Sequence, residues 1–393
     1  MIRVEMLATG DEVLHGQIVD TNAAWLAERL FSEGLPMSSR MTVGDRLEEL
    51  VAALQQRSQI ADVLIVNGGL GPTSDDLSSL AAATAAGVRL QLHPQWLKTM
   101  EAWFAARGRV MAAANRKQAE IPENAEMLDN PIGTACGFAL QLNRCWVFFT
   151  PGVPSEFKMM VDQQIIPRIR ERFSPDPAPV CLRLTTFGRG ESSLASELEG
   201  LTLPQGAVMG YRSSMPIIEL KLTGPAAAAE QMAAVWSEVQ RIAGDSLLYE
   251  GTTPLPSRLA AALTARQLTL SLCESYTAGL LSWHLTSAGT PVCDARVSPA
   301  LDDSPAHMAA SGGNGQLALV VGPLRADDTI AFLLRTPQGS FYQRVTLNLA
   351  HYGLSVRQET VAMTAMNMLR RWLAGEPATG GYGWVGVVEE QRL

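Results

Sequence analysis

Lysine is scarce in this sequence of 393 residues, and positive charge as a whole is in short supply. The four lysines are Lys98, Lys117, Lys158 and Lys221, and none follows the last of these. Lysine and arginine together number 31 against 39 aspartates and glutamates, which gives a formal net charge of −8. A chain without a basic excess cannot neutralise many phosphates, so this composition argues against nucleic acid as a partner.

Long apolar runs and paired cysteines are also missing. No stretch approaches the roughly 20 apolar residues that span a bilayer, and Glu5 interrupts the beginning, where a secretory signal would continue into an apolar run. The five cysteines are scattered, without a Cys-x-x-Cys pair, at Cys136, Cys145, Cys181, Cys273 and Cys293. This spacing is typical of reduced thiols and not of a disulfide framework or a zinc site. We therefore expect a cytoplasmic protein without a membrane partner.

Hydrophobic residues are plentiful, at 47% of the chain, which is enough to fill the cores of more than one domain. Apolar runs at 2–8 and 61–67 are typical of strands, and 36–43 fits a further strand. The segments 23–33 and 45–57 between these strands have helical spacing. This β-α-β-α-β order predicts an α/β fold with a doubly wound, mainly parallel sheet.

Local signals predict where individual helices begin. Thr21 and Asn22 offer caps for the first helix, and Asp45 with Glu48 resembles a capping box for the second. A single longer helix is expected over 155–173, although it contains a proline.

Two turn-rich segments predict domain boundaries. The first, 174–180, is rich in proline, and the second lies at 251–256. They divide the chain into an α/β domain at 1–173, a small α+β domain at 174–250 and an α/β domain at 251–393.

Three loops rich in glycine or proline each follow a predicted strand of the first domain, at 9–16, 67–76 and 150–156. In an open parallel sheet, ligands bind beyond the carboxyl ends of the strands, where loop amides receive anions. Asp75 and Asp76 would repel a bare phosphate but fit one bridged by a divalent metal ion. The alternative is that each loop is only a turn followed by a helix cap.

Four segments in order carry a resemblance to a known family; they read TGDEVLHGQIVDTN, VNGGLGPTSDD, NRKQAEIPENAEMLDNPIGTACGF and TPGVPSEF. They are similar to the motifs of the CinA family, the competence/damage-inducible proteins, over residues 1–170. The resemblance implies a molybdopterin-binding fold for the first domain, a KH-like topology for the second and a nicotinamide-mononucleotide deamidase fold for the third. The family usually has proline at the position of Cys136.

The resemblance also implies an activity, which is metal-dependent cleavage of the pyrophosphate in ADP-ribose-like dinucleotides. The cofactor would be Mg, Mn or Co, held by Asp11 and Asp76. The implied catalytic residues are Asp75, Asp76, Lys117 and Glu156. The implied substrate-binding residues are Gly10, Asp11, Glu12, Gly69, Gly71, Thr73, Asn115, Gln118, Gly133, Thr134 and Gly152. Lys117 can equally be a plain surface lysine.

The last domain resembles the family's deamidase without its complete active site. Glu274 and Ser275 match the motif that carries the family's nucleophilic serine, but the tyrosine and lysine that assist it are missing. A serine hydroxyl is a weak nucleophile unless a neighbouring base takes its proton. We therefore predict that deamidation is absent and that Ser275 caps a helix.

Three functions stay open. The first is the metal-dependent pyrophosphatase, which acts on a nucleotide-type small molecule. The second is a protein that binds a nucleotide or pterin without turnover, and the third is an active deamidase. A homodimer is expected by analogy with related α/β domains.

Overall fold

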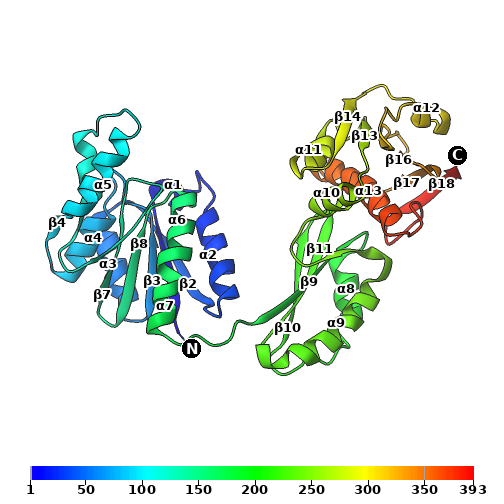
Figure 1. Cartoon of the computed structure of the whole chain (residues 1–393). Coiled ribbons are helices and arrows are strands. Elements are labelled where there is room, and N and C mark those ends of the chain that lie inside the picture. Colours follow the sequence, from blue (N-terminus) through cyan, green and yellow to red (C-terminus); the bar gives the residue numbers. More distant parts are fainter. Residues whose placement is uncertain (1, 349) are drawn as a thin grey trace. The chain divides into compact units, whose positions relative to one another are not determined.

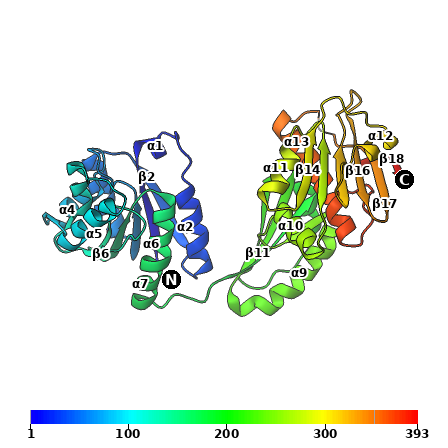
Figure 2. The same ribbon diagram turned by 45° about the horizontal axis from the view of Figure 1, so that its top comes forward.

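The computed structural model describes residues 2–348 and 350–393, which form two compact units (Figures 1 and 2). One unit ends at Pro179 and the other begins at Val180. The division falls inside the proline-rich segment 174–180 that the sequence marks as a boundary. The second predicted boundary, at 251–256, stays a prediction.

The first unit is built on a six-stranded sheet in the order β2-β1-β3-β8-β7-β6. Strands β2, β1, β3 and β8 are parallel, while β7 and β6 run antiparallel to their neighbours. The strands are β1 (Val4–Thr9), β2 (Met37–Val43), β3 (Val63–Asn67), β6 (Glu126–Leu128), β7 (Gly137–Leu142) and β8 (Cys145–Thr150). The prediction of a mainly parallel sheet is therefore confirmed for this unit.

Helices cover both faces of this sheet (Figure 1). One face packs Leu26, Leu30 and Phe157 from its helices, and the other packs Leu54 and Trp96. The helices are α2 (Thr21–Ser32), α6 (Pro154–Met160) and α7 (Ile166–Arg172) on the first face, and α3 (Leu47–Ser58), α4 (Ser78–Ala86) and α5 (Pro94–Ala105) on the second. Because both faces are covered, the central strands are apolar on both sides.

Smaller elements complete the first unit. They are α1 (Asp11–Leu14), the strand pair β4 (Leu90–Leu92) and β5 (Glu120–Pro122), and a 3₁₀ turn at Ala113–Ala119.

Both predicted helix caps in this unit are wrong. The Asp20 carboxylate, not Thr21 or Asn22, caps α2 by accepting a hydrogen bond from the amide of Ala23 at 2.8 Å. Helix α3 has Arg46 at its N-cap with no side-chain cap, because the Asp45 carboxylate accepts instead from the amide of Asp11 at 3.0 Å. That contact spans 34 residues, so a local pattern does not reveal it.

The helix expected over 155–173 is present but not continuous. A π-helical turn at Val161–Ile165 separates α6 from α7, and Pro167 lies in the first turn of α7. Proline has no amide hydrogen to donate to the preceding turn, so the wider turn before it accommodates the missing bond.

The second unit contains two sheets. The smaller one is wholly antiparallel in the order β10-β11-β9-β12, and α8 and α9 supply Leu194 and Trp236 to its core. Its elements are β9 (Val180–Phe187), α8 (Glu191–Leu198), β10 (Val208–Ser214), β11 (Ile217–Gly224), α9 (Ala229–Ala243) and β12 (Leu247–Glu250).

The larger sheet of this unit has the order β14-β13-β15-β16-β17-β18, parallel for the first three strands and antiparallel beyond them. Its strands are β13 (Leu270–Glu274), β14 (Val292–Val297), β15 (Leu317–Val321), β16 (Thr329–Thr336), β17 (Gly339–Thr346) and β18 (Gly386–Arg392). The helices are α10 (Leu255–Ala265), α11 (Leu280–Ser287), α12 (Pro305–Ala310) and α13 (Leu354–Leu373). Two hydrophobic clusters, one built partly from α10, α11 and α13, fill its core.

All five cysteines are free thiols, and their exposure differs widely. Burial raises the pKa of both Cys136 and Cys145 to about 12. Cys293, on strand β14, is exposed. Among the described residues, no helix has the length and apolar character needed to cross a membrane.

Candidate functional site

The candidate site is a cavity of about 460 Å³ in the first unit. It lies where β1, β3 and β8 end, and the loops that follow these three strands supply most of its wall. Gly10, Gly69, Gly71 and Gly152 line it, as does Thr73. The edge of the sheet that the sequence marks for ligand binding therefore carries an open cavity, as expected for this topology.

Glycine is required at the turn after β3. Gly68 and Gly69 have φ angles of 110° and 67°, which side chains rarely adopt. A Cβ at Gly69 would also collide with the hydroxyl of Ser78, which donates to the Gly68 carbonyl at 2.8 Å. The turn consequently brings backbone, and not side chains, to the cavity.

Three consecutive amides in this turn have no acceptor. Within the described part of the chain, the backbone N–H groups of Gly69, Leu70 and Gly71 donate to no other protein group. Successive free N–H groups form the kind of concave surface that receives anions. This turn is therefore the place where the cavity can hold a phosphate.

A pair of asparagines joins the start of α2 to the loops after β3 and β8, a role that the sequence did not predict. The Asn22 amide donates to Asn67 Oδ1 and to the Gly152 carbonyl, both at 2.9 Å. Asn67 in turn donates to the Pro151 carbonyl at 2.6 Å. The only available signal was that Asn67 ends an apolar strand. Thr9 Oγ1 and Asn22 Oδ1 are buried without a partner in the described structure.

Five acidic residues line the same cavity, Glu12, Asp20, Asp45, Asp75 and Asp76, and the Asp20 carboxylate also caps α2. None of them forms an ion pair with a described residue within 4.0 Å. Burial raises the pKa of Asp45, and repulsion from Asp11, Glu12 and Asp75 adds to the rise. The cavity is therefore acidic and short of cations.

Asp75 and Asp76 differ in their surroundings. A hydrogen bond from Thr73 lowers the pKa of Asp75, which is fully exposed. The Asp76 carboxylate accepts from both the amide and the hydroxyl of Thr73, the amide at 2.8 Å. Lys117 donates its Nζ to the Thr73 carbonyl and does not line the cavity. Asp76 and Lys117 thus hold the shape of the turn, while Asp75 lies exposed in the cavity lining.

The remaining predicted residues lie away from the cavity lining. Glu156 accepts from Asn130 at 2.7 Å, and a Cβ at Gly133 would collide with the Glu156 carboxylate. A second cluster joins the side chains of Asn115, Gln118 and Thr134 through Gln118 Oε1. Asp11 also lies outside the lining, where its amide and carboxylate exchange hydrogen bonds with Asp45.

The donor set was tested for a divalent metal ion. In the described parts of the chain, no three Asp, Glu, His or Cys side chains are close enough to hold one by themselves. The acids of the cavity would therefore need further oxygen ligands, which a bound phosphate can supply. Hard divalent cations accept such shared oxygen sets, so the residues fit a cation that is held jointly with its ligand.

The chain is similar to known proteins over its whole length. Residues 5–171 match the family described as a probable molybdopterin binding domain. The CinA-like protein of Escherichia coli O9:H4 (strain HS) is 57% identical over 399 residues, with all of both chains covered. The chain belongs to the CinA-like protein family. The NMN amidohydrolase-like protein YfaY of Escherichia coli K12 shows the same identity and coverage.

Solved structures are similar to part of this CinA-like chain. The CinA protein of Thermoplasma acidophilum is 27% identical with a TM-score of 0.39, over 43% of this chain and 96% of that one. The molybdopterin biosynthesis enzyme MoaB of Thermus thermophilus is 19% identical with a TM-score of 0.30, over 43% and 91%.

In the deamidase-like motif of this CinA-like chain, the serine is nearly buried and its hydroxyl is already hydrogen-bonded. Ser275 is 9% exposed, and its hydroxyl donates to the Pro299 carbonyl at 3.3 Å. The predicted helix cap is wrong, because α11 begins five residues later and its amides at Leu281 and Ser282 donate to Glu274, at 3.2 and 3.1 Å. The longer Glu274 side chain reaches these amides from the end of β13.

Proposed function

We propose that the first unit binds a nucleotide-type molecule by its phosphates and, together with a divalent cation, cleaves the pyrophosphate linkage. The observation that carries the proposal is that one cavity contains both free backbone amides and carboxylates without ion-pair partners. Free amides of the turn at 69–71 attract phosphate oxygens, and unpaired carboxylates face the same space. Such a cavity favours a phosphate whose charge a cation has already neutralised.

In this proposal, different residues of the chain bind the phosphates, hold the cation and position the turn. The amides of Gly69 and Gly71, which line the cavity, bind and orient the phosphates without charge of their own. Glu12, Asp45 and Asp75 would hold the cation jointly with the phosphate oxygens, and the cation supplies charge neutralisation when bound. Lys117 is a positioning residue, because its ammonium group is bonded to the turn itself.

The test is hydrolysis of ADP-ribose by the full chain, with and without Mg²⁺, Mn²⁺ or Co²⁺, followed as release of AMP. Asp75→Asn keeps the shape of an exposed side chain and removes its charge, so we expect the metal-dependent rate to fall by about 10²-fold. Glu101→Gln is the matched control, an exposed acid on α5 outside the cavity, and it leaves the rate unchanged.

Binding without hydrolysis would favour a binding function over an enzymatic one. If the protein binds ADP-ribose or a pterin with no AMP release under any metal, the first unit is a binding protein. The matched family description, a probable molybdopterin binding domain, favours that second candidate. AMP release that is indifferent to both metal and Asp75→Asn would contradict the mechanism.

We further propose that the second unit does not deamidate nicotinamide mononucleotide. Its support is the buried Ser275 hydroxyl, which is bonded to a carbonyl and not to a base. The test is ammonia release from nicotinamide mononucleotide by the wild type and by Ser275→Ala. Release by the wild type that disappears in Ser275→Ala would show an active site, whereas equal background from both supports the proposal.

A further inference from the structure

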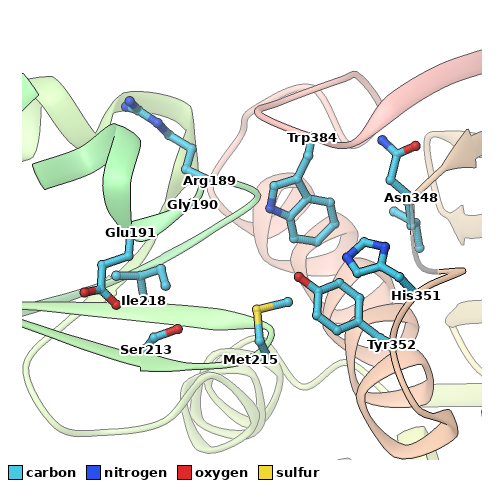
Figure 3. Close-up of a pocket in the computed structure, with 11 residues that line it drawn as sticks. Arg189, Gly190, Glu191, Ser213, Met215, Ile218, Asn348, His351, Tyr352 and Trp384 are labelled. Atoms are coloured by element: carbon cyan, nitrogen blue, oxygen red, sulfur yellow. The ribbon is translucent and has the colours of Figure 1, made fainter. Parts of the chain in front are cut away.

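A second cavity, of about 380 Å³, lies within the second unit, and neither Glu274 nor Ser275 lines it. We call it the Trp384 pocket and define it by its lining, which is Arg189, Gly190, Glu191, Ser213, Met215, Ile218, Leu347, Asn348, His351, Tyr352 and Trp384 (Figure 3). Its walls come from the start of α8, the β10–β11 hairpin tip, the loop before α13 and the loop before β18. Its volume is in the range of small-molecule sites.

Aromatic rings form one side of the Trp384 pocket. Figure 3 shows the rings of Trp384, Tyr352 and His351 grouped together, with the Met215 thioether near them. The His351 and Tyr352 rings pack with their centroids 4.0 Å apart. Aromatic faces and a polarisable sulfur favour a flat, unsaturated ligand.

The position of Trp384 is fixed before any ligand arrives. Its amide donates to the Gly188 carbonyl at 2.7 Å, and its ring meets Phe187 edge-on, with centroids 5.1 Å apart and planes at 77°. Trp384 and Tyr352 also pack against the main apolar cluster of this unit. A rigid ring loses little freedom when it binds a ligand.

The charge left over in the Trp384 pocket is negative. Arg189 is already occupied, since it donates to the Ile242 carbonyl and the Ser193 hydroxyl, both at 3.0 Å, and pairs with Glu197. Figure 3 shows its guanidinium directed away from the rings. Glu191, by contrast, is exposed and has no hydrogen bond or ion pair with any residue that the structure describes.

We propose that the Trp384 pocket binds a planar heteroaromatic ligand that carries a positive charge. The ring of such a ligand lies against Trp384 and Tyr352, whose faces attract cations, and Glu191 neutralises its charge. The hydroxyl groups of Ser213 and Tyr352 remain available for polar substituents. This site is independent of the phosphate-binding cavity, so neither proposal depends on the other.

The experiment compares two probes of nearly equal shape, the 1-methylquinolinium cation and neutral quinoline, by calorimetric titration into the full chain at neutral pH. We expect the cation to bind about tenfold more tightly than quinoline. Glu191→Gln removes most of this preference, while Trp384→Leu weakens both probes. The matched controls are Glu230→Gln, an exposed acid on α9, and Trp283→Leu, an exposed tryptophan on α11, and both retain wild-type binding.

Equal affinity for the two probes overturns the proposal, as does a preference that survives Glu191→Gln. Absence of saturable binding by either probe overturns it as well. Trp384 packs against a core cluster, so Trp384→Leu could unfold the unit; the circular dichroism spectrum checks this. Glu191 lies on the surface, and its variant decides the question in that case.

Discussion

The two units treat acidic side chains at the ends of their parallel strands in opposite ways. Beyond β1, β2 and β3 of the first unit, five carboxylates line a cavity and none is paired with a described cation. In the second unit, two acids near the ends of β13 and β15 are instead bonded within the protein. Glu274 is fully buried and accepts from Thr277 and two amides of α11, while Asp303 is paired with Arg325 and Arg344.

The difference shows that topology creates a possible site and that side chains decide whether it stays available. In the second unit, Asp303 is 7% exposed and packs beside Gly322, directly after β15, where a Cβ would lie 3.1 Å from its own. The carboxylates there form their hydrogen bonds with the protein itself, so these groups are not available to a ligand. In the first unit, the same capacity still faces the cavity.

The largest expected effect comes from breaking the ion pair in the second unit. Asp303→Ala leaves Arg344 buried at 7% side-chain exposure with its main partner gone, so the free energy of unfolding of this unit falls by about 3–5 kcal/mol. Chemical denaturation measures the change. Asp302→Ala is the neighbouring control, because that carboxylate is 61% exposed, and an equal loss from it would contradict the assignment.

A smaller loss is expected at Glu274. Glu274→Gln keeps the volume but replaces one oxygen acceptor of the α11 amides and the Ser282 hydroxyl with a donor, at a cost of about 2 kcal/mol. The same denaturation experiment gives the value. Glu359→Gln, a partly exposed glutamate on α13, is the comparison, and the interpretation fails if it costs as much.

The ion pair also predicts an acid response. Burial opposes ionisation of Asp303, but hydrogen bonds from Arg344 and Arg325 outweigh it and hold the pKa below the ordinary 3.8. The stabilisation is therefore complete above that value and is lost as the pH falls through the lower pKa of the folded state. Asp303→Asn should make the unfolding free energy less dependent on pH below about pH 4. If the unfolding free energy of that variant still falls with pH as in the wild type, other carboxylates control the acid response.

The smallest effect is expected in the first unit, and it has the opposite sign. Because neighbouring acids and burial raise the pKa of Asp45, its ionised form is destabilising at neutral pH. Asp45→Asn should raise the unfolding free energy by up to about 0.5 kcal/mol, and the gain should shrink in high salt. The same change should weaken metal-dependent nucleotide binding. Stabilisation without any loss of binding would remove Asp45 from the site.

Much of the first unit follows from sequence patterns that act over short distances. Continuous apolar runs predicted β1 and β3 to within a few residues, because burial on both faces requires such runs. The edge strand β2 has no fully buried residue and was predicted without such a run. The helix caps at Asp45 and Ser275 were wrong for a shared reason. In each case a contact outside the local pattern decides: the Asp11 amide, 34 residues away, occupies the Asp45 carboxylate, and the neighbouring Glu274 side chain binds the amides of α11.

The sequence predicted where the candidate site lies, but not what each side chain does within it. The glycine turn and its aspartates were marked correctly as facing one edge of the sheet. Local spacing could not show that Asp76 and Lys117 both bind Thr73, or that Asn22 and Asn67 join α2 to the loops after β3 and β8. Hydrogen bonds between distant segments assign those roles, and they have no sequence signature.

The unequal burial of the thiols makes the second unit open to selective chemistry. Alkylating reagents attack thiolates, so Cys136 and Cys145, with pKa values of about 12 and buried sulfurs, should be inert in the folded protein. Cys293 is exposed on the outermost strand of the larger sheet of its unit. A fluorophore attached there would report on the folding of that sheet without touching either cavity, and without any engineered cysteine.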